Sequence, residues 1–384
     1  MAVATDSRTT LLGGMARSFR EDRTTAVVAL CLGIGALTWP AIDSVLGLAT
    51  LNTMFPIIVY IVLALGLNIV VGFAGLLDLG YAAFFAIGAY TIAILTSPRS
   101  PVVDQLPFQL NFWSALVLAF FVTALFGVIL GAPTLRLRGD YLAIVTLGFG
   151  EIVPVVFRNA RGITFGEQGL NAIDRPTIFG FAFGNNAVRW YYLVVVLAFV
   201  MVFLAIRLRD SRLGRAWMAM REDEVAAAAM GINLVRTKLY AFALGASFSG
   251  FAGVIFASRY SFAAPSQFEF STSVLLLAMV ILGGLGNIWG VILGGLMLGV
   301  FDRILSDRLS GWVNGLGEAW NVGFLETLDL TRFRFGIFGL TLVLMMLLRP
   351  EGILPNAQRR EELHADEGDS EANQSLYDER GTPV

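Results

Sequence analysis

The hydrophobic and polar residues of this chain are segregated into long alternating blocks. Apolar blocks of about 20 residues recur between residues 26 and 349, and a helix of that length can cross a bilayer. The pattern predicts an all-α polytopic membrane protein with about ten transmembrane helices, some of them short or broken. We place the spans at residues 26–42, 51–72, 79–97, 111–134, 141–158, 189–207, 237–258, 271–285, 287–303 and 335–349.

Two regions of these blocks are rich in glycine, Gly66–Tyr90 and Leu282–Gly295. Small residues at such spacings let helices pack closely, and clustered glycines also permit a helix to break. Broken backbone at membrane depth is tolerated only where it is buried in protein or lines a cavity, so a translocation path beside these segments is one interpretation. Close packing alone is the other, and we favour it at any single glycine. We place residues 271–303 as two short spans rather than one broken span.

The densest basic cluster lies between two apolar blocks, in the basic segment Arg207–Lys238. Its middle is predicted to be one helix flanked by Gly214 and Gly231, with Glu224 and four consecutive alanines near its C-terminal end. We interpret it as a docking element for a soluble cytoplasmic partner, although an ordinary polar loop between spans fits the pattern equally well. Its basic residues are Arg207, Arg209, Arg212, Arg215, Arg221, Arg236 and Lys238.

Charge sets the predicted topology. Loops next to membrane spans carry excess Arg and Lys on the cytoplasmic side, which places the basic segment there, together with Arg136 and Arg138. With ten spans, both termini are then cytoplasmic. Residues 1–25 form a cytoplasmic N-terminal segment and residues 26–350 a transmembrane domain. Residues 351–384 are acidic, lack apolar periodicity and are predicted to be a disordered cytoplasmic tail.

Polar residues inside the predicted spans are few. An ionisable side chain in hydrocarbon costs at least about 2.5–3.5 kcal/mol, so it normally faces a bundle interior, a cavity or an opposite charge. For Glu151 we favour a structural pairing, with Arg158 or with a neighbouring helix, over a role in transport. Asp78 is placed at the cytoplasmic interface between the second and third spans, where a charge costs little. The candidates for a translocation path are Asn68, Asp78, Tyr81, Glu151 and Asn287.

Composition excludes several classes of site. The 384 residues are 56% hydrophobic and 15% charged, with one cysteine, one histidine (His364) and one lysine. One cysteine allows neither an intrachain disulfide nor a cysteine-based metal site, and the membrane region has no histidine for a Ser-His-Asp triad. A P-loop needs G-x-x-x-x-G-K-[ST], which the sequence around Lys238 does not supply. We expect no enzyme, no metal and no cofactor in this chain, so any ATP and Mg²⁺ belong to separate subunits.

Four motifs, in this order and spacing, carry a family resemblance. The chain resembles the permease subunits of branched-chain amino-acid ABC importers over residues 50–355, and it is closer to the M-type subunit than to its H-type paralogue. The RPEGI sequence at residues 349–353 also fits. The motifs are GLNIVVGFAGLLDLGYAAFFAIGAY, RLRGDYLAIVTLGFGEIV, GRAWMAMREDEVAAAAMGIN and LAMVILGGLGNIWGVILGG.

The resemblance implies an importer of leucine, isoleucine or valine in the cytoplasmic membrane. Its other components are a homologous H-type permease, two P-loop ATPase subunits and an extracellular or periplasmic substrate-binding protein. Residues 208–238 correspond to the EAA-type coupling loop, which inserts into a groove on the ATPase. Val225 departs from the general motif, and the usual Leu-Pro after the glycine is missing. The expected coupling residues are Arg215, Arg221, Glu224, Ala226, Ala227 and Gly231.

Two alternatives remain. Related permeases carry urea or short amides, so the substrate is less firmly implied than the machinery. A self-sufficient secondary transporter, with Glu151 and Asp78 in a proton or sodium path, is also compatible with the residues. A membrane enzyme has little support, because the membrane region offers no clustered carboxylates and no histidine.

Overall fold

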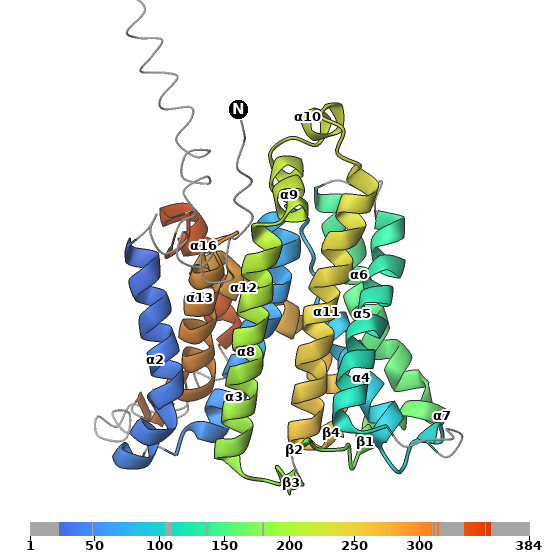
Figure 1. Ribbon diagram of the computed structural model, residues 1–384, viewed down its shortest axis with the longest axis vertical. Coiled ribbons are helices and arrows are strands. Elements are labelled where there is room, and N and C mark those ends of the chain that lie inside the picture. Colours follow the sequence, from blue (N-terminus) through green and yellow to red (C-terminus); the bar gives the residue numbers. More distant parts are fainter. Residues whose placement is uncertain are drawn as a thin grey trace, which may run out of the picture. The chain divides into compact units, whose positions relative to one another are not determined.

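The structure is a computed structural model that describes residues 23–354, except 48, 104–109, 135, 136, 138, 179, 307, 309, 312, 315–333 and 350. The predicted N-terminal segment and acidic tail therefore lie almost wholly outside the described residues. The described part is nearly all helical (Figure 1). Its main helices are α2 (Arg23–Leu46), α3 (Leu51–Asn68), α4 (Ala82–Thr96), α5 (Phe112–Thr134), α6 (Asp140–Asn159), α8 (Ala187–Arg209), α9 (Arg212–Glu222), α10 (Glu224–Ala229), α11 (Leu234–Tyr260), α12 (Phe270–Gly283), α13 (Ile288–Val300) and α16 (Arg334–Leu348).

Among the described residues, eight helices are long and apolar enough to cross a membrane, and two shorter apolar helices, Ala82–Thr96 and Gly336–Leu348, accompany them. Together they coincide with the ten predicted spans. Residues 271–303 form two helices, α12 and α13, as expected. The prediction of an all-α polytopic membrane protein is confirmed.

The chain divides into two units, residues 1–52 and 53–384. In the first unit, α2 ends near a polar clasp: the backbone N–H and the hydroxyl of Thr50 both donate to Asp43 Oδ1, at 2.8 and 2.6 Å. The clasp gives the buried carboxylate of Asp43 hydrogen-bond donors.

The core of the second unit is α11 packed between α4 and α5. A Cβ atom added at Gly88 of α4 would overlap the backbone of Gly250 in α11, and one added at Gly253 would overlap the carbonyl of Phe85. Thr123 of α5 fills the space that a side chain at Gly250 would need. Close packing, the favoured interpretation of single glycines, therefore holds here.

The first glycine-rich region is a broken helix. α3 continues into a π-helical turn, η1 (Ile69–Phe73), after which residues 75–78 have no regular structure and α4 begins at Ala82. Gly75, in this segment, has φ +69°, a backbone conformation that favours glycine. α13 likewise runs into a π-helical turn, η5 (Phe301–Leu305).

The break between α12 and α13 is closed by the last described residues. The N–H groups of Ile353 and Leu354 donate to the carbonyl oxygens of Leu282 and Gly283, at 3.0 and 3.2 Å. Gly352, with φ +84°, lies so close to the backbone at residues 283–284 that a Cβ atom would collide with it. Residues 351–354, which include the last three residues of the RPEGI motif, thus form a clasp over the break.

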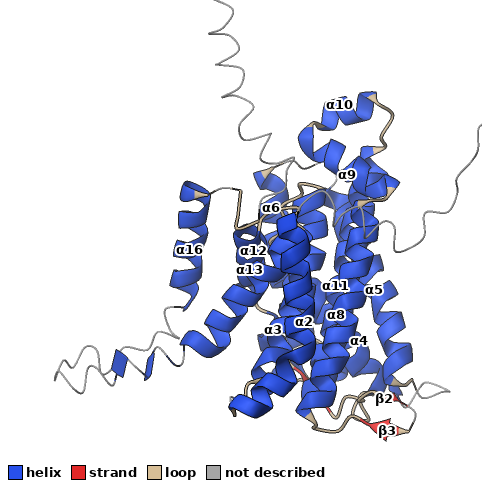
Figure 2. Ribbon diagram, turned by 60° about the vertical axis from the view of Figure 1, so that its left-hand side comes forward, coloured by secondary structure: helices blue, strands red, loops and turns tan. Residues whose placement is uncertain are grey.

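The remaining short elements are α7 (Arg161–Thr164), the 3₁₀ turns η3 (Gly166–Gln168) and η4 (Pro265–Phe268), and four two-residue strands. β1 (Leu170–Asn171) pairs antiparallel with β4 (Phe262–Ala263), and β2 (Thr177–Ile178) pairs antiparallel with β3 (Phe181–Ala182). The strands lie at the end of the helical bundle opposite to α9 and α10 (Figures 1 and 2). The hydropathy pattern did not predict them.

Candidate functional site

The basic segment folds into two short helices instead of the single helix that was predicted. α9 ends at Glu222 and α10 begins at Glu224, because Asp223 has extended backbone and caps the second helix. Gly214, predicted to precede the helix, lies in the first turn of α9.

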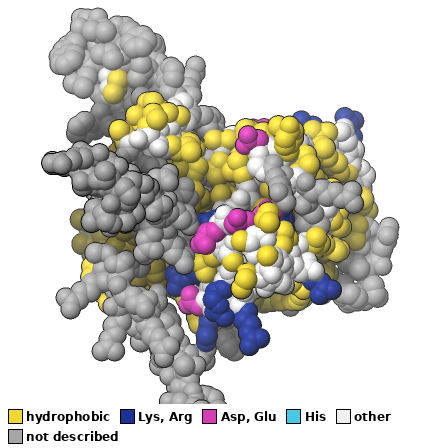
Figure 3. All heavy atoms as spheres, turned by 90° about the horizontal axis from the view of Figure 1, so that it is seen from above, with side chains coloured by type: hydrophobic (Ala, Val, Ile, Leu, Met, Phe, Trp, Pro, Cys, Tyr) yellow, Lys and Arg dark blue, Asp and Glu magenta, His cyan; other side chains and the backbone are white. Residues whose placement is uncertain are grey.

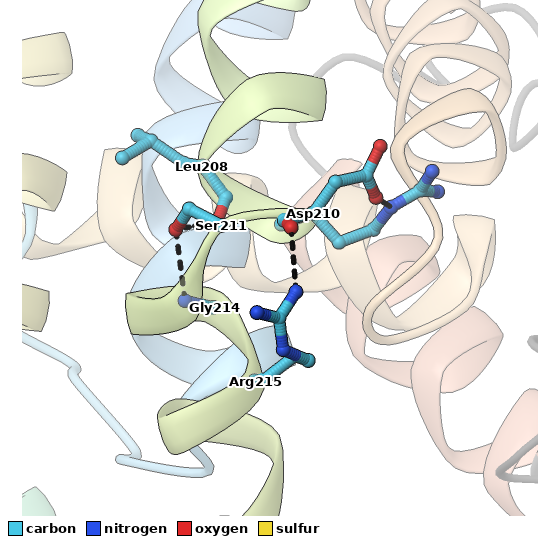
Figure 4. A network of polar contacts seen from close by, with 6 residues as sticks. Leu208, Asp210, Ser211, Gly214 and Arg215 are labelled. Carbon is cyan, nitrogen blue, oxygen red and sulfur yellow. Dashed lines mark hydrogen bonds and ion pairs between the residues drawn. The ribbon is translucent and has the colours of Figure 1, made fainter. Parts of the chain in front are cut away.

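The start of α9 is fixed against the end of α8 (Figure 4). Ser211 caps α9: its Oγ accepts from the N–H of Gly214 at 3.1 Å and donates to the Leu208 carbonyl at 2.7 Å. The guanidinium of Arg215 donates to the Asp210 carbonyl at 2.9 Å. A Cβ atom at Gly214 would collide with the last carbonyl oxygens of α8. The turn between the helices is therefore tightly determined.

The opposite side of α9 is anchored in the membrane domain. Trp217 is fully buried, and its Nε1 donates to the Thr237 carbonyl of α11 at 2.8 Å. Arg221 reaches further, since its Nη1 donates to the Gly72 carbonyl in η1 at 2.7 Å. The side chain of Arg221 also packs on Gly75, where a Cβ atom would collide with it. α9 thus contacts both α11 and the broken end of α3.

α10 is capped at both ends. Asp223 Oδ1 accepts from the N–H groups of Val225 and Ala226, at 2.7 and 3.0 Å, and these hydrogen bonds lower the pKa of its carboxyl group. At the other end Gly231 has φ +86°, and its N–H donates to the Ala228 carbonyl while the N–H of residue 232 donates to the carbonyl of residue 227. This bonding is a Schellman motif, which explains the glycine.

Glu224 is held within the chain. Its carboxylate pairs with Lys238 Nζ of α11 at 2.6 Å, and Lys238, the only lysine, is 4% exposed. The predicted coupling residues consequently differ in accessibility. Ala227 is buried, whereas Arg221 and Glu224 are half-buried. The exposed members are Arg215, Ala226 and Gly231.

The exposed side of α10 is apolar. Val225 and Met230 are 68% and 83% exposed, and Ala226, Ala228 and Ala229 are exposed between them. We call these five residues the α10 ridge. Figure 3 views this end of the molecule and shows hydrophobic side chains with groups of basic and acidic side chains beside them.

Two of the predicted path residues are structural polar groups. Asn68 is 1% exposed, and its Oδ1 accepts from the N–H of Gly286, in the break between α12 and α13, at 2.9 Å. Asn287 caps α13 through the N–H groups of Trp289 and Gly290, and its Nδ2 donates to the Leu354 carbonyl at 3.1 Å. These two asparagines therefore join α3, the break and the C-terminal clasp.

Asp78 is 2% exposed, so its carboxyl group is enclosed by protein, and its place at the cytoplasmic interface stays a prediction. The segment before α4 lies inside the bundle, where Asp78 Oδ1 accepts from the N–H of Gly80 at 2.9 Å. Nearby, Tyr81 is fully buried and donates to the Gly245 carbonyl at 2.6 Å. Asp78 lines a cavity of about 70 Å³ together with Thr134, Thr146 and apolar side chains of α5, α6 and α11.

Within the described residues, Glu151 forms neither of the pairs that we favoured. Arg158 forms its ion pair with Glu167, and Glu151 has no hydrogen bond or ion pair with any residue that the structure describes. Its side chain is exposed on α6. The structure brings Asn68 and Asn287 to the break between α12 and α13. Asp78 and Tyr81 lie in the segment between η1 and α4, and Glu151 lies apart from both places.

Sequence reasoning missed three residues of this site: the cap Asp223, the anchor Trp217 and the partner Lys238. An Asp directly before a helical run is a recognisable N-cap signal, so Asp223 could have been found. The other two contacts depend on the packing of α9 against α11. Within the described residues, no group of three His, Cys, Asp or Glu side chains is placed to hold a metal ion.

The chain is similar to a known protein family and to named transport proteins. The family model described as "Branched-chain amino acid transport system / permease component" matches residues 49–346. Two proteins named "High-affinity branched-chain amino acid transport system permease protein LivM" are each 40% identical to this chain. The Salmonella typhimurium protein matches over 85% of this chain and 74% of its own length, and the Escherichia coli K12 protein over 83% and 72%.

The corresponding LivH permease protein of Escherichia coli K12 is 25% identical over 77% of this chain and 91% of its own length. No solved structure matches the chain. The match of the family model and the two relatives at 40% identity together show that this chain belongs to the family of branched-chain amino acid transport system permease components.

Proposed function

We propose that the chain is the M-type membrane subunit of an ATP-driven importer of leucine, isoleucine and valine, and that it passes the motion of separate ATPase subunits to its own helices through α9 and α10. Family membership makes the chain a multi-pass transport permease and not an enzyme. The names of the two relatives at 40% identity describe high-affinity branched-chain amino acid transport, which favours this substrate class over urea or short amides.

The observation that carries the coupling role is the α10 ridge. In a membrane protein, exposed apolar residues on the bilayer-facing sides contact lipid, but the α10 ridge lies at the end of the bundle, on a capped helix within a strongly basic segment. Apolar groups exposed to water and rimmed by charges are typical of a protein docking surface. A cytoplasmic ATPase subunit is the occupant that the family implies.

The contacts below α10 provide a route for the motion. α9 is bonded to the end of α3 by Arg221 and Gly72, and Asn68 of the same helix is bonded to Gly286 in the break between α12 and α13. Each contact joins elements that are far apart in the sequence. A displacement of α9 would therefore act on α3 and the break together, provided that this network has two arrangements.

The other components follow from the resemblance and from charge. We propose two P-loop ATPase subunits that bind ATP and Mg²⁺, an H-type permease beside this chain and a binding protein at the strand-bearing end. The match to LivH supports the H-type partner. The basic segment supports a cytoplasmic position for α9 and α10. Both termini would then face the cytoplasm of a cell whose cytoplasmic membrane holds the complex.

The coupling role is tested by placing a charge on the α10 ridge. Ala228→Arg puts a long cation on an exposed position, so the helix should still fold while an apolar groove of the ATPase rejects it. We expect the amount of ATPase that co-purifies with the tagged permease to fall at least about tenfold, together with leucine uptake. The control for ATPase recovery is Phe181→Arg, which places an arginine at an exposed residue of the opposite end.

Normal recovery of the ATPase with Ala228→Arg would show that the α10 ridge is not the docking surface. If the wild-type complex were to carry leucine without any ATPase and lose that activity with an ionophore, the secondary-transporter alternative would replace the proposal altogether.

A further inference from the structure

Glu151 lies in the middle of a membrane span and points away from its own bundle. It is eleven residues after Asp140 and eight residues before Asn159, the two ends of α6. At 1.5 Å per residue these separations are about 16 and 12 Å, so the carboxylate lies well inside the bilayer thickness. The side chain is exposed, and no described residue bonds to it.

The surroundings of Glu151 are branched and apolar. Ile144, Ile152 and Val155 share its helix face and are 65%, 57% and 43% exposed. A Cβ atom at Gly148, on the same face, would meet no atom within 4 Å. The opposite side of α6 packs inward, where Gly150 contacts the backbone of Gly80. We call the outward residues 144, 148, 151, 152 and 155 the α6 face.

Contact with lipid would be costly for a carboxylate in this position. An ionisable group in the hydrocarbon core is costly and normally faces protein, water or a cation. Among the described helices, no other acidic or basic side chain is both exposed and in the middle of a span. The only cationic side chain of α6, Arg158, is paired with Glu167. Within the described part of this chain, Glu151 therefore has no cationic partner.

We propose that the α6 face lines the substrate path and that Glu151 receives the α-ammonium group of the amino acid as it crosses the membrane. This inference rests on the proposed function. A branched-chain amino acid combines one ammonium group with a branched aliphatic side chain, and the α6 face combines one carboxylate with isoleucine and valine. The substrate carboxylate then points away from α6, because this face carries no free cation.

The geometry makes Glu151 a specificity residue rather than a structural one. Charge-assisted hydrogen bonds between ammonium and carboxylate are stronger than neutral ones, so loss of the charge weakens the binding of the substrate. The same change removes no contact that holds the helical bundle together. The binding of substrate analogues that lack the ammonium group should not change when Glu151 is substituted.

The test uses the assembled importer, purified without its binding protein so that only membrane-domain contacts are measured. Saturation-transfer NMR would follow the weak binding of 3-methylbutylamine, which keeps the ammonium group of leucine, and of 4-methylpentanoate, which keeps only the carboxylate. With Glu151→Gln we expect the amine signal to fall about tenfold and the pentanoate signal to stay unchanged. Leucine uptake should fall by a similar factor.

Two variants serve as controls. Glu151→Asp keeps the charge and should retain most of the amine signal. Val196→Leu changes an exposed apolar residue of α8, outside the α6 face, and should behave like the wild type. An unchanged amine signal in Glu151→Gln would overturn the inference. Loss of a second permease subunit from the purified Glu151→Gln complex would also overturn it, because Glu151 would then hold a subunit interface.

The two proposals fail separately. If wild-type uptake requires the ATPase but Glu151→Gln transports at the wild-type rate, only the role of Glu151 is wrong. If the wild-type complex carries no branched-chain amino acid, the proposed function is wrong as well.

Discussion

Single residues of the basic segment already distinguish internal contacts from external ones. Lys238 is nearly inaccessible to solvent and forms an ion pair with Glu224, the first residue of α10. Val225 and Met230, at the start and just after the end of the same helix, are exposed. The sequence showed the charge of Glu224 and its resemblance to a coupling motif. It could not show the ion pair, because residues 224 and 238 lie on different helices whose packing fixes the distance.

The ion pair leads to a stability prediction. Glu224→Leu leaves the buried ammonium group of Lys238 without its counter-charge, which should lower the stability of the permease by on the order of 3 kcal/mol. The double variant Glu224→Leu with Lys238→Leu removes both charges and should recover most of the loss. Thermal unfolding of the purified complex measures both, and equal loss in the single and double variants would contradict the prediction.

The cap at Asp223 leads to a pH prediction. Its hydrogen bonds lower its pKa below the ordinary value of 3.8, so the folded state favours the ionised carboxylate. The cap therefore stabilises α10 above that pH, and its contribution is lost as the pH falls below 3.8 towards the lowered pKa. Cleavage of α10 by pepsin should rise across this window. Asp223→Asn keeps an N-cap acceptor but does not titrate, so this variant should not show the additional cleavage of α10 that the wild type shows as the pH falls.

At the scale of elements, the span helices were predictable and their connections were not. Apolar blocks of membrane length define α5, α6, α8 and α11 because nothing else in a sequence requires such blocks. The division of the basic segment at Asp223 and the inward course of residues 75–80 were missed. Both depend on where the backbone finds hydrogen-bond partners, such as the N–H groups bonded to Asp223 and Asp78.

The contact between α9 and η1 leads to a prediction about coupling. Arg221→Ala removes the hydrogen bond to Gly72 while leaving Trp217 to anchor α9, so the ATPase should still bind. We expect leucine uptake to fall about tenfold while ATP hydrolysis falls much less, because the link to α3 is lost. Arg212→Ala, which removes an exposed arginine of the same helix, is the matched control. Parallel loss of both activities would assign Arg221 to docking instead.

At the scale of the molecule, the described helices of the second unit alternate in direction from α3 to α13, as expected for successive membrane spans. The α9–α10 segment and the strands lie at opposite ends. Sequence reasoning gave the number and order of the spans and, through the resemblance, the family. The pairing of β1 with β4 was beyond it, since two-residue strands separated by four helices leave no signal in hydropathy.

The two ends lead to a prediction of sidedness. In a Cys31→Ser background, which removes the only cysteine, Met230→Cys and Phe181→Cys each place one thiol at an exposed position of opposite ends. A thiol reagent that does not cross the cytoplasmic membrane should label Phe181→Cys in cells whose cytoplasmic membrane is intact. It should label Met230→Cys only after the cytoplasmic membrane is opened. The reverse pattern would invert the proposed topology.

The clasp of residues 351–354 over the break between α12 and α13 has a consequence for biosynthesis. The chain grows from its N-terminus, so α12 and α13 enter the membrane before the residues that seal their junction exist. Until residues 351–354 are synthesised, the carbonyl groups of Leu282 and Gly283 and the side-chain amide of Asn287 lack these hydrogen-bond partners. A chain that ended before residue 351 would therefore contain α12, α13 and α16 but lack the hydrogen bonds that close the break between α12 and α13.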